Sequence, residues 1–113
     1  MAWDDIAQWQ PQDLFASLKM GDKVLPVDCR EFSWREAETK IRGATRIDPM
    51  SFTSAIDELP KEKEIVFYCD RPGEQTSMKI ALTAFDKGYT RVGVLVGGFE
   101  AWAAADYPVE PKE

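Results

Sequence analysis

The chain has 113 residues, of which 44% are hydrophobic, and its 14 basic and 20 acidic side chains give a formal net charge of −6. This length fits a single domain, 1–113, with a packed core expected over about 10–109. The acidic balance argues against a protein that follows nucleic-acid phosphates, so we expect no nucleic-acid partner. Histidine is absent, which excludes Ser-His-Asp and Cys-His catalysis as well as histidine metal sites.

The two cysteines, Cys29 and Cys69, are too few for a disulfide framework and are not spaced like zinc ligands. We therefore expect a reducing compartment and no metal or other cofactor. The N-terminus has no basic segment before an apolar stretch, and no apolar stretch approaches the length that spans a bilayer. These features predict a cytoplasmic protein with no membrane partner.

The first half of the chain alternates between helical and strand patterns. In order, these are a helix that opens at 11–13 and stops at Gly21, a buried strand at 24–27, a short helix at 32–38 and a second short strand at 44–47. Pro26 cannot donate to a strand ladder, so it indicates an edge position or a bulge. Asp48 followed by Pro49 predicts the start of the next helix, which Pro60 ends.

The second half repeats this alternation. It contains a charged turn at 61–64, an apolar strand at 65–68, a helix from 76 to about 87, a strand at 92–96 and a small helix at 99–105. We expect the charged turn to be solvated surface. Strands that alternate with helices predict an α/β fold, with a mainly parallel sheet of about five strands and helices on both faces.

Cys69 is the main candidate for chemistry because it ends a buried strand, at the edge of a parallel sheet where ligands bind. Backbone N–H groups of the following loop can converge on its sulfur, and the dipole of the next helix favours an anion there. Such a setting can lower the pKa of a thiol to roughly 3.5–7.5. The pattern indicates a nucleophilic or sulfur-carrying thiolate; the alternative is a small buried thiol at a strand end.

Five segments, in this order and spacing, resemble a single-domain rhodanese-like protein. They are Val27-Asp28-Cys29-Arg30-Glu31, Ile41-Arg42-Gly43-Ala44, the strand from Ile65 to Cys69, the stretch from Gly88-Tyr89 to Gly98-Phe99-Glu100-Ala101-Trp102, and Pro108-Val109. The resemblance covers about 10–109. It implies a three-layer rhodanese-like fold and a sulfurtransferase. In that reaction a cysteine thiolate takes sulfur from a sulfane donor such as thiosulfate, becomes a persulfide, and passes the outer sulfur to a thiol or cyanide-like acceptor.

The resemblance also assigns roles to residues. Cys69 takes the role of the nucleophile, and the anion-binding loop comprises Asp70, Arg71, Pro72, Gly73, Glu74 and Gln75 with the helix start Thr76 and Ser77. Asp28 and Arg30 match largely architectural positions near the active-site rim, while Trp102 and Gly97-Gly98 match structural positions. The implied partners are a sulfur donor and a thiol acceptor, either small molecules or proteins, and we expect a monomer or weak dimer.

The loop departs from the usual family pattern, Cys-x-x-Gly-x-Arg-Ser. Ser77 stands two residues late, and Gln75 or Thr76 is nearest the place of the missing arginine; before Ile41, Lys40 stands where the family often has histidine. Longer loops that end in Glu-x-x-Ser resemble a divergent branch of the family.

The loop carries two carboxylates, Asp70 and Glu74, and one cation, Arg71. If the carboxylates point inward, they disfavour a thiosulfate dianion. We therefore hypothesise that thiosulfate is a poor donor compared with a persulfide or a protein, and that backbone dipoles with Arg71 activate the thiolate. The alternative is that both carboxylates point to solvent and cap the following helix.

Other readings stay open. Cys29 is either a buried core thiol or a resolving thiol that pairs with an oxidised or persulfidated Cys69. Cysteine phosphatases and arsenate reductases need Cys-x5-Arg, whereas the sixth residue after Cys69 is Gln75. A third reading is an inactive or regulatory binding module, in which Trp3, Ile6 and Trp9 form an exposed docking strip or a local clasp over the core.

Overall fold

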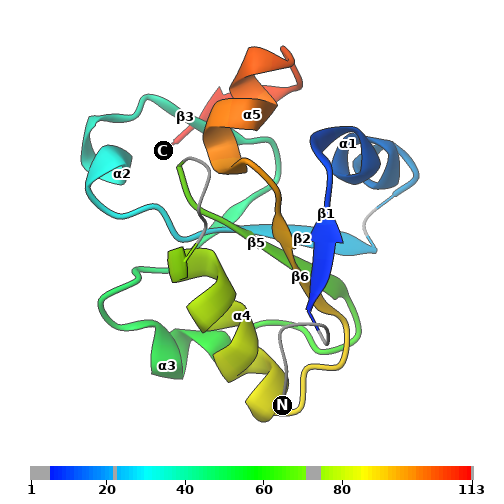
Figure 1. Ribbon diagram of the computed structural model, residues 1–113, viewed down its shortest axis with the longest axis vertical. Helices are drawn as coiled ribbons and strands as arrows, with labels where there is room; N and C mark the ends of the chain where they lie inside the picture. The colour runs from blue at the N-terminus through cyan, green and yellow to red at the C-terminus, as the bar shows by residue number, and fades with distance from the viewer. Residues whose placement is uncertain (1–5, 22, 71–74, 113) are drawn as a thin grey trace.

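A five-stranded parallel sheet forms the centre of the computed structural model, which describes residues 6–21, 23–70 and 75–112 (Figure 1). Its strands are β1 (Ala7–Trp9), β2 (Val24–Asp28), β4 (Thr45–Arg46), β5 (Glu64–Tyr68) and β6 (Val92–Leu95), in the spatial order β1-β6-β5-β2-β4. Two further strands, β3 (Thr39–Ile41) and β7 (Val109–Pro111), pair antiparallel as a separate small sheet. The strand that leads into Cys69, β5, is therefore the middle strand of the main sheet.

Helices cover both faces of this sheet, as the alternating pattern predicted (Figure 1). They are α1 (Pro11–Lys19), α2 (Phe32–Glu36), α3 (Phe52–Ile56), α4 (Gln75–Asp86) and α5 (Gly98–Ala104). Ile65 and Phe67 of β5 pack into the cluster that holds the buried residues of α3 and α4. Val66 and Tyr68 pack on the opposite face, with the buried residues of α1 and α5. The α/β fold with a five-stranded parallel sheet is confirmed.

β2 is an interior strand of the sheet, yet Pro26 has a strand partner on its β5 side only, so the expected edge position holds locally. β2 pairs with β5 along its whole length, but β4 pairs only with Val27 and Asp28. The Asp28 carbonyl accepts a hydrogen bond from the Ile47 N–H on the β4 side. Backbone groups two residues apart face the same way, so the nitrogen of Pro26 points to this side just before the pairing with β4 begins. The N–H group that proline lacks would therefore lie just before the hydrogen-bonded pairing of β2 with β4 begins.

The helix expected to start at Asp48 and Pro49 begins later, at Phe52, and this prediction is wrong by one turn. Oδ1 of Asp48 accepts a hydrogen bond from the backbone N–H of Met50 at 2.9 Å, and its carbonyl accepts from Ser51 at 3.0 Å. Asp48 therefore closes a turn ahead of the helix, which is another common role of aspartate.

The packed structure extends past both ends of the expected core. Ile6 is 3% exposed and belongs to the core on the α4 side, and Trp9 packs half-buried on the opposite side of the sheet. The idea of an exposed docking strip is therefore wrong for Ile6, while Trp3 lies outside the described residues. At the other end, β7 runs to Pro111.

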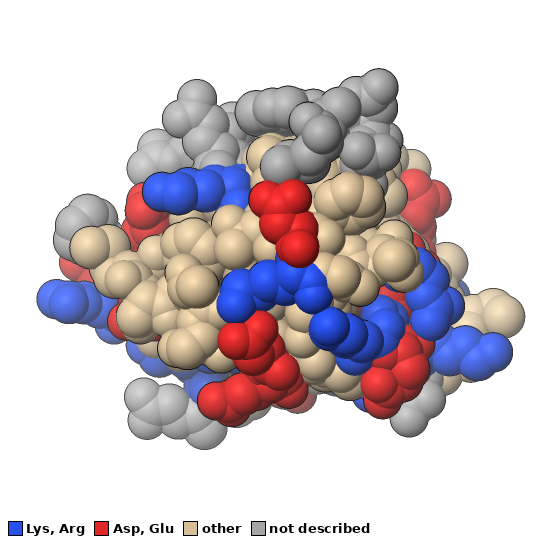
Figure 2. Space-filling model, turned by 90° about the horizontal axis from the view of Figure 1, so that it is seen from below, with Lys and Arg blue, Asp and Glu red and all other residues tan. Residues whose placement is uncertain are grey.

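Charged side chains of both signs lie interspersed on the face shown in Figure 2. Among the charged side chains, Lys87 pairs with Asp57 at 2.9 Å. Of the charged turn expected at 61–64, Lys61 and Glu62 are exposed as predicted, whereas Lys63 and Glu64 are half-buried and Glu64 already belongs to β5. No helix in the described part of the chain is long and apolar enough to cross a membrane.

Candidate active site

Cys69 directly follows the middle strand of the sheet, at the carboxyl edge predicted from the sequence. The residue is 7% exposed, and its Sγ lies 3.6 Å from Oγ of Ser77. Ser77 is the third residue of α4 and is fully buried. The sulfur therefore faces a hydroxyl at the positive end of a twelve-residue helix, where an anion is favoured. The two extra residues of the loop do not separate this serine from the cysteine.

The carbonyls at the start of the active-site loop are held by the first turn of α5. The N–H of Phe99 donates to the Cys69 carbonyl at 2.7 Å, and the N–H of Glu100 donates to the Asp70 carbonyl at 2.8 Å. Gly97 and Gly98 lead into this turn with φ angles of 81° and 62°, a region that favours glycine. The resemblance assigned this glycine pair a structural role. In the structure, the two glycines direct the N–H groups of Phe99 and Glu100 toward the carbonyls that begin the loop.

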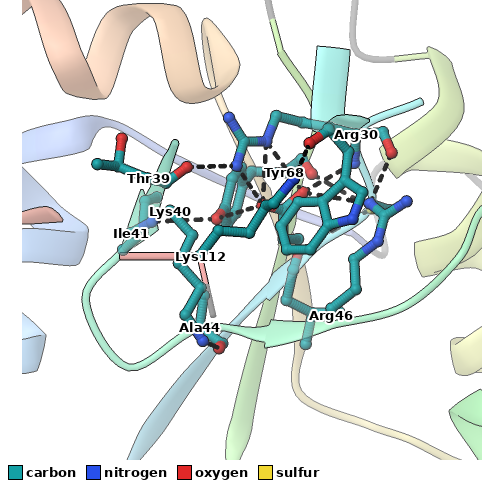
Figure 3. A network of polar contacts seen from close by, with 12 residues as sticks. Arg30, Thr39, Lys40, Ile41, Ala44, Arg46, Tyr68 and Lys112 are labelled. Atoms are coloured by element: carbon teal, nitrogen blue, oxygen red, sulfur yellow. Dashed lines mark hydrogen bonds and ion pairs between the residues drawn. The ribbon is translucent and has the colours of Figure 1, made fainter. Parts of the chain in front are cut away.

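A buried ionic network lies beneath the carboxyl edge of β2 (Figure 3). Asp28 and Arg30 are 0% and 2% exposed, so they lie below the rim of the site rather than on its surface. The Arg30 side chain donates to both carboxylate oxygens of Asp28, with the shortest contact at 2.7 Å, and also donates to the Thr39 carbonyl at 2.8 Å. Through these contacts the pair joins β2 to β3.

Arg46 completes the network and was not singled out from the sequence. It donates to the Arg30 carbonyl at 2.6 Å, lies 3.5 Å from Asp28, and stacks over the Trp34 ring at 4.4 Å (Figure 3). Burial lowers the pKa of Arg46 from its ordinary value, while the negative charge of Asp28 raises it. One carboxylate and two guanidinium groups leave the cluster net positive. The signal in the sequence was an arginine within the short strand expected at 44–47.

Aromatic rings enclose the Arg30 side chain. Its guanidinium carbon lies 4.2 Å from the centre of the Phe99 ring and 5.5 Å from that of Trp34. Phe99 in turn stacks on Tyr68 with ring centres 6.1 Å apart. Since the Phe99 N–H also donates to the Cys69 carbonyl, the ionic network and Cys69 share one supporting residue.

Cys29 is fully buried beside the candidate nucleophile. Its Sγ lies 3.3 Å from the Tyr68 carbonyl. Burial raises the pKa of the Cys29 thiol well above its ordinary value, and the negative charges of Cys69 and Asp28 raise it further, against a smaller opposing effect of Arg46. Cys29 is therefore a neutral thiol near physiological pH.

The structure describes both ends of the expected anion-binding loop. Arg71, Pro72, Gly73 and Glu74 lie outside the described residues, so the predicted convergence of loop amides on the sulfur stays a prediction. Asp70 is half-buried at the start of the loop, and Thr76 is half-buried at the start of α4 with Gln75 before it. Among the described residues, no three His, Cys, Asp or Glu side chains gather as a metal site.

The order of elements and the cysteine at the end of β5 agree with a known family. Residues 11–105 match the rhodanese-like domain. This chain belongs to the rhodanese-like domain family.

Several known proteins resemble this chain in sequence or structure. Thiosulfate sulfurtransferase GlpE from Glaesserella parasuis is 27% identical over 100 residues, which cover 88% of this chain and 89% of that protein. The BH2092 protein from Bacillus halodurans superposes with a TM-score of 0.79 at 30% identity, covering 91% of this chain and 75% of the other. A protein of unknown function from Rhodopseudomonas palustris, described as a possible tyrosine phosphatase, has a TM-score of 0.75 and 28% identity over 95% of this chain and 86% of its own.

Proposed function

We propose that this rhodanese-like protein is a sulfurtransferase that carries sulfane sulfur as a persulfide on Cys69. The observation that carries the proposal is the position of the Cys69 sulfur, 3.6 Å from the Ser77 hydroxyl at the N-terminal end of α4. A hydroxyl and a helix dipole both stabilise a negative sulfur. The family relationship to a named thiosulfate sulfurtransferase supports the same reaction.

The reaction divides into two displacements at sulfur. In the first, the Cys69 thiolate attacks the outer sulfur of the donor, the S–S bond of the donor breaks, and the rest of the donor leaves with the electron pair; from thiosulfate, the leaving group is sulfite. In the second, a thiolate or cyanide attacks the outer sulfur of the persulfide. The persulfide S–S bond breaks, and the electron pair returns to Cys69 as a thiolate.

Intact mass measurement tests this proposal directly. The protein is incubated with thiosulfate, or separately with a low-molecular-weight persulfide, and the excess donor is removed. We expect a gain of one sulfur atom that disappears on treatment with cyanide, with release of thiocyanate. The Cys29→Ser variant, in which Cys69 is the remaining cysteine, should keep the adduct, and Cys69→Ser should lose it. A folded protein that takes up no sulfur from either donor would overturn the proposal and favour a binding module.

The phosphatase alternative rests on the description of the Rhodopseudomonas palustris relative. A cysteine phosphatase needs an arginine that binds the oxyanion in a bidentate manner, and Gln75 occupies that place in this sequence. We expect no hydrolysis of p-nitrophenyl phosphate. Turnover that is abolished in Cys69→Ala would support the phosphatase instead.

A further inference from the structure

The two cysteines occupy opposite positions at the ends of two neighbouring strands. The parallel register pairs Asp28 of β2 with Tyr68 of β5, so Cys29 and Cys69 are the next pair. The ladder continues into this pair, because the N–H of Cys29 donates to the Tyr68 carbonyl at 2.9 Å. Neighbouring strands lie about 4.8 Å apart, and a disulfide joins Cα atoms separated by roughly 4.4–6.8 Å. The main chain therefore provides the spacing that a disulfide needs.

The side chains of the two cysteines also point to the same face of the sheet. Side chains two residues apart in a strand share a face, and Cys29 lies in the α4-side core with Val27 and Phe67. Cys69 follows Phe67 by two residues, and its sulfur contacts Ser77 of α4. The Cys29 sulfur leans toward β5, where it lies 3.3 Å from the carbonyl of the peptide group that leads into Cys69.

We propose that Cys29 is a resolving thiol, which forms a disulfide with Cys69 once the Cys69 sulfur carries a leaving group. This inference rests on the proposed function only in taking Cys69 as the reactive thiol. The Cys69 thiolate attacks an oxygen of a hydroperoxide, the O–O bond breaks with release of water or an alcohol, and Cys69 becomes a sulfenic acid. Cys29 sulfur then attacks Sγ of Cys69, the S–O bond breaks, and water leaves with the Cys29 proton. From the persulfide, the same attack breaks the S–S bond and releases hydrogen sulfide. In the first case Cys29 sulfur is oxidised and Cys69 sulfur is reduced from the sulfenic acid to the disulfide level, the peroxide having been the oxidant. In the second case Cys29 sulfur is oxidised and the departing outer sulfur is reduced to hydrogen sulfide.

Burial determines the order of these events. Cys29 is 0% exposed, whereas Cys69 lies at the sheet edge with 7% exposure, so an oxidant or donor reaches Cys69 first. The charge of the Cys69 thiolate is one cause of the raised pKa of Cys29, and that charge is lost when Cys69 becomes a neutral sulfenic acid. Reaction at Cys69 thus removes one obstacle to deprotonation of Cys29. A thiol reductant would reopen the disulfide and restore both residues.

The first of two experiments uses hydrogen peroxide as the probe, because oxidation of Cys69 by peroxide needs no sulfur donor. The protein is treated with peroxide, trapped with an alkylating agent, and digested without reduction. We expect a peptide pair linked through Cys29 and Cys69, a mass loss of two hydrogen atoms in the intact chain, and full recovery of both thiols with dithiothreitol. In Cys29→Ser and Cys29→Ala, peroxide should instead convert Cys69 to sulfinic and sulfonic acids several-fold faster than in the natural chain, without recovery.

A second experiment, with protein that carries a persulfide, tests this inference separately from the proposed function. Wild-type protein loaded with sulfur should release hydrogen sulfide and close the disulfide, whereas Cys29→Ser should hold its persulfide several-fold longer. Failure of Cys29→Ser to take up sulfur would overturn the proposed function and leave the peroxide result standing. The resolving role is overturned if no linked peptide forms in the wild-type chain and its Cys69 is over-oxidised as fast as in the two variants. Because the linked peptide is detected in the wild-type chain, this result does not depend on the folding of the variants.

Discussion

The hydroxyl of Tyr68 donates a hydrogen bond to Oδ2 of Asp28 at 2.9 Å, joining the middle strand of the sheet to its neighbour. The same hydroxyl accepts a hydrogen bond from the Ile41 N–H at 3.2 Å, which ties in β3 as well. The buried hydroxyl of Tyr68 on β5 therefore connects this strand to Asp28 on β2 and to Ile41 on β3.

Replacing Tyr68 with phenylalanine should destabilise the fold by about 1–3 kcal/mol, because the buried Ile41 N–H loses its acceptor and Asp28 loses a donor. Chemical denaturation measures this change. Tyr107→Phe is the matched control, since the Tyr107 ring stacks on Phe15 with centres 4.6 Å apart and is retained in the variant. Equal losses in the two variants would show that the buried hydrogen bonds contribute little.

Removal of the Ser77 hydroxyl should weaken the Cys69 nucleophile. A hydrogen bond of this kind contributes about 0.5–1.5 kcal/mol, which corresponds to a roughly two- to tenfold change in an equilibrium. We expect Ser77→Ala to slow alkylation of Cys69 by iodoacetamide at neutral pH by that factor, because a smaller fraction of the thiol is ionised. Alkylation is followed in the Cys29→Ser background, so that one thiol is observed.

The control for this experiment is Thr83→Ala in the same helix. The Thr83 hydroxyl bonds to the Lys79 carbonyl at 3.1 Å, away from the active site. Its removal should leave the alkylation rate unchanged. Unchanged reactivity in both variants would mean that Ser77 does not stabilise the anion.

Two glycines with nearly equal backbone angles allow the support of the active-site loop to be tested. Gly97 and Gly43 have φ values of 81° and 83°. An alanine at either position should cost about 1–2 kcal/mol for the left-handed conformation. At Gly97 the added Cβ would also lie 2.6 Å from the Cβ of Ala101, whereas nothing lies within 4 Å of the Cβ at Gly43. Gly97→Ala should therefore destabilise the fold more than Gly43→Ala.

Gly97→Ala should also reduce the reactivity of Cys69, because the first turn of α5 holds the carbonyls of Cys69 and Asp70. Alkylation rates of the two alanine variants, measured at a temperature where both remain folded, check this expectation. If Gly97→Ala lowers the stability but leaves the alkylation rate of Cys69 normal, the reactivity of Cys69 does not depend on the hydrogen bonds from α5.

Alkaline pH should destabilise the protein. The pKa of Cys29 is raised well above its ordinary value of 9.0, chiefly by burial, and the pKa of Tyr68 is also raised, again chiefly by burial. The unfolded chain ionises these groups near their ordinary values while the folded chain keeps them protonated. The stabilisation is therefore fully present below those values and is lost as the pH rises above them.

Urea unfolding at about pH 8 and about pH 10.5 measures this effect, since each such group contributes a slope of roughly 1.36 kcal/mol per pH unit within its range. Cys29→Ser should show a smaller loss between the two values than the natural chain. Identical losses would indicate that Cys29 ionises equally in both states.

Thiosulfate should be a poorer sulfur donor than a low-molecular-weight persulfide, because the loop sequence carries the carboxylates Asp70 and Glu74. Repulsion of a dianion by these groups weakens as salt screens the charges. We expect thiosulfate:cyanide turnover to be slow and to rise in the Glu74→Gln variant. A catalytic efficiency as high with thiosulfate as with the persulfide would contradict this prediction.

The sequence predicted the layered architecture and the place of Cys69 well, because both depend on local patterns. Apolar runs and helical spacing define the elements, and a residue that follows a strand of a parallel sheet must lie at its carboxyl edge. The three-residue strands β1, β3 and β7 escaped prediction, since so few residues carry no periodic signal. The helix start at Asp48 was misplaced because aspartate closes turns as readily as it caps helices.

By itself, the sequence determined the fold class, the family and the identity of the candidate nucleophile, because these follow from patterns along the chain. Tertiary structure alone decided that Asp28 and Arg30 lie buried beneath the site, that Ser77 reaches the sulfur despite a longer loop, and that Cys29 stands opposite Cys69. Each of these depends on strand order and register, which bring together residues that are far apart in sequence.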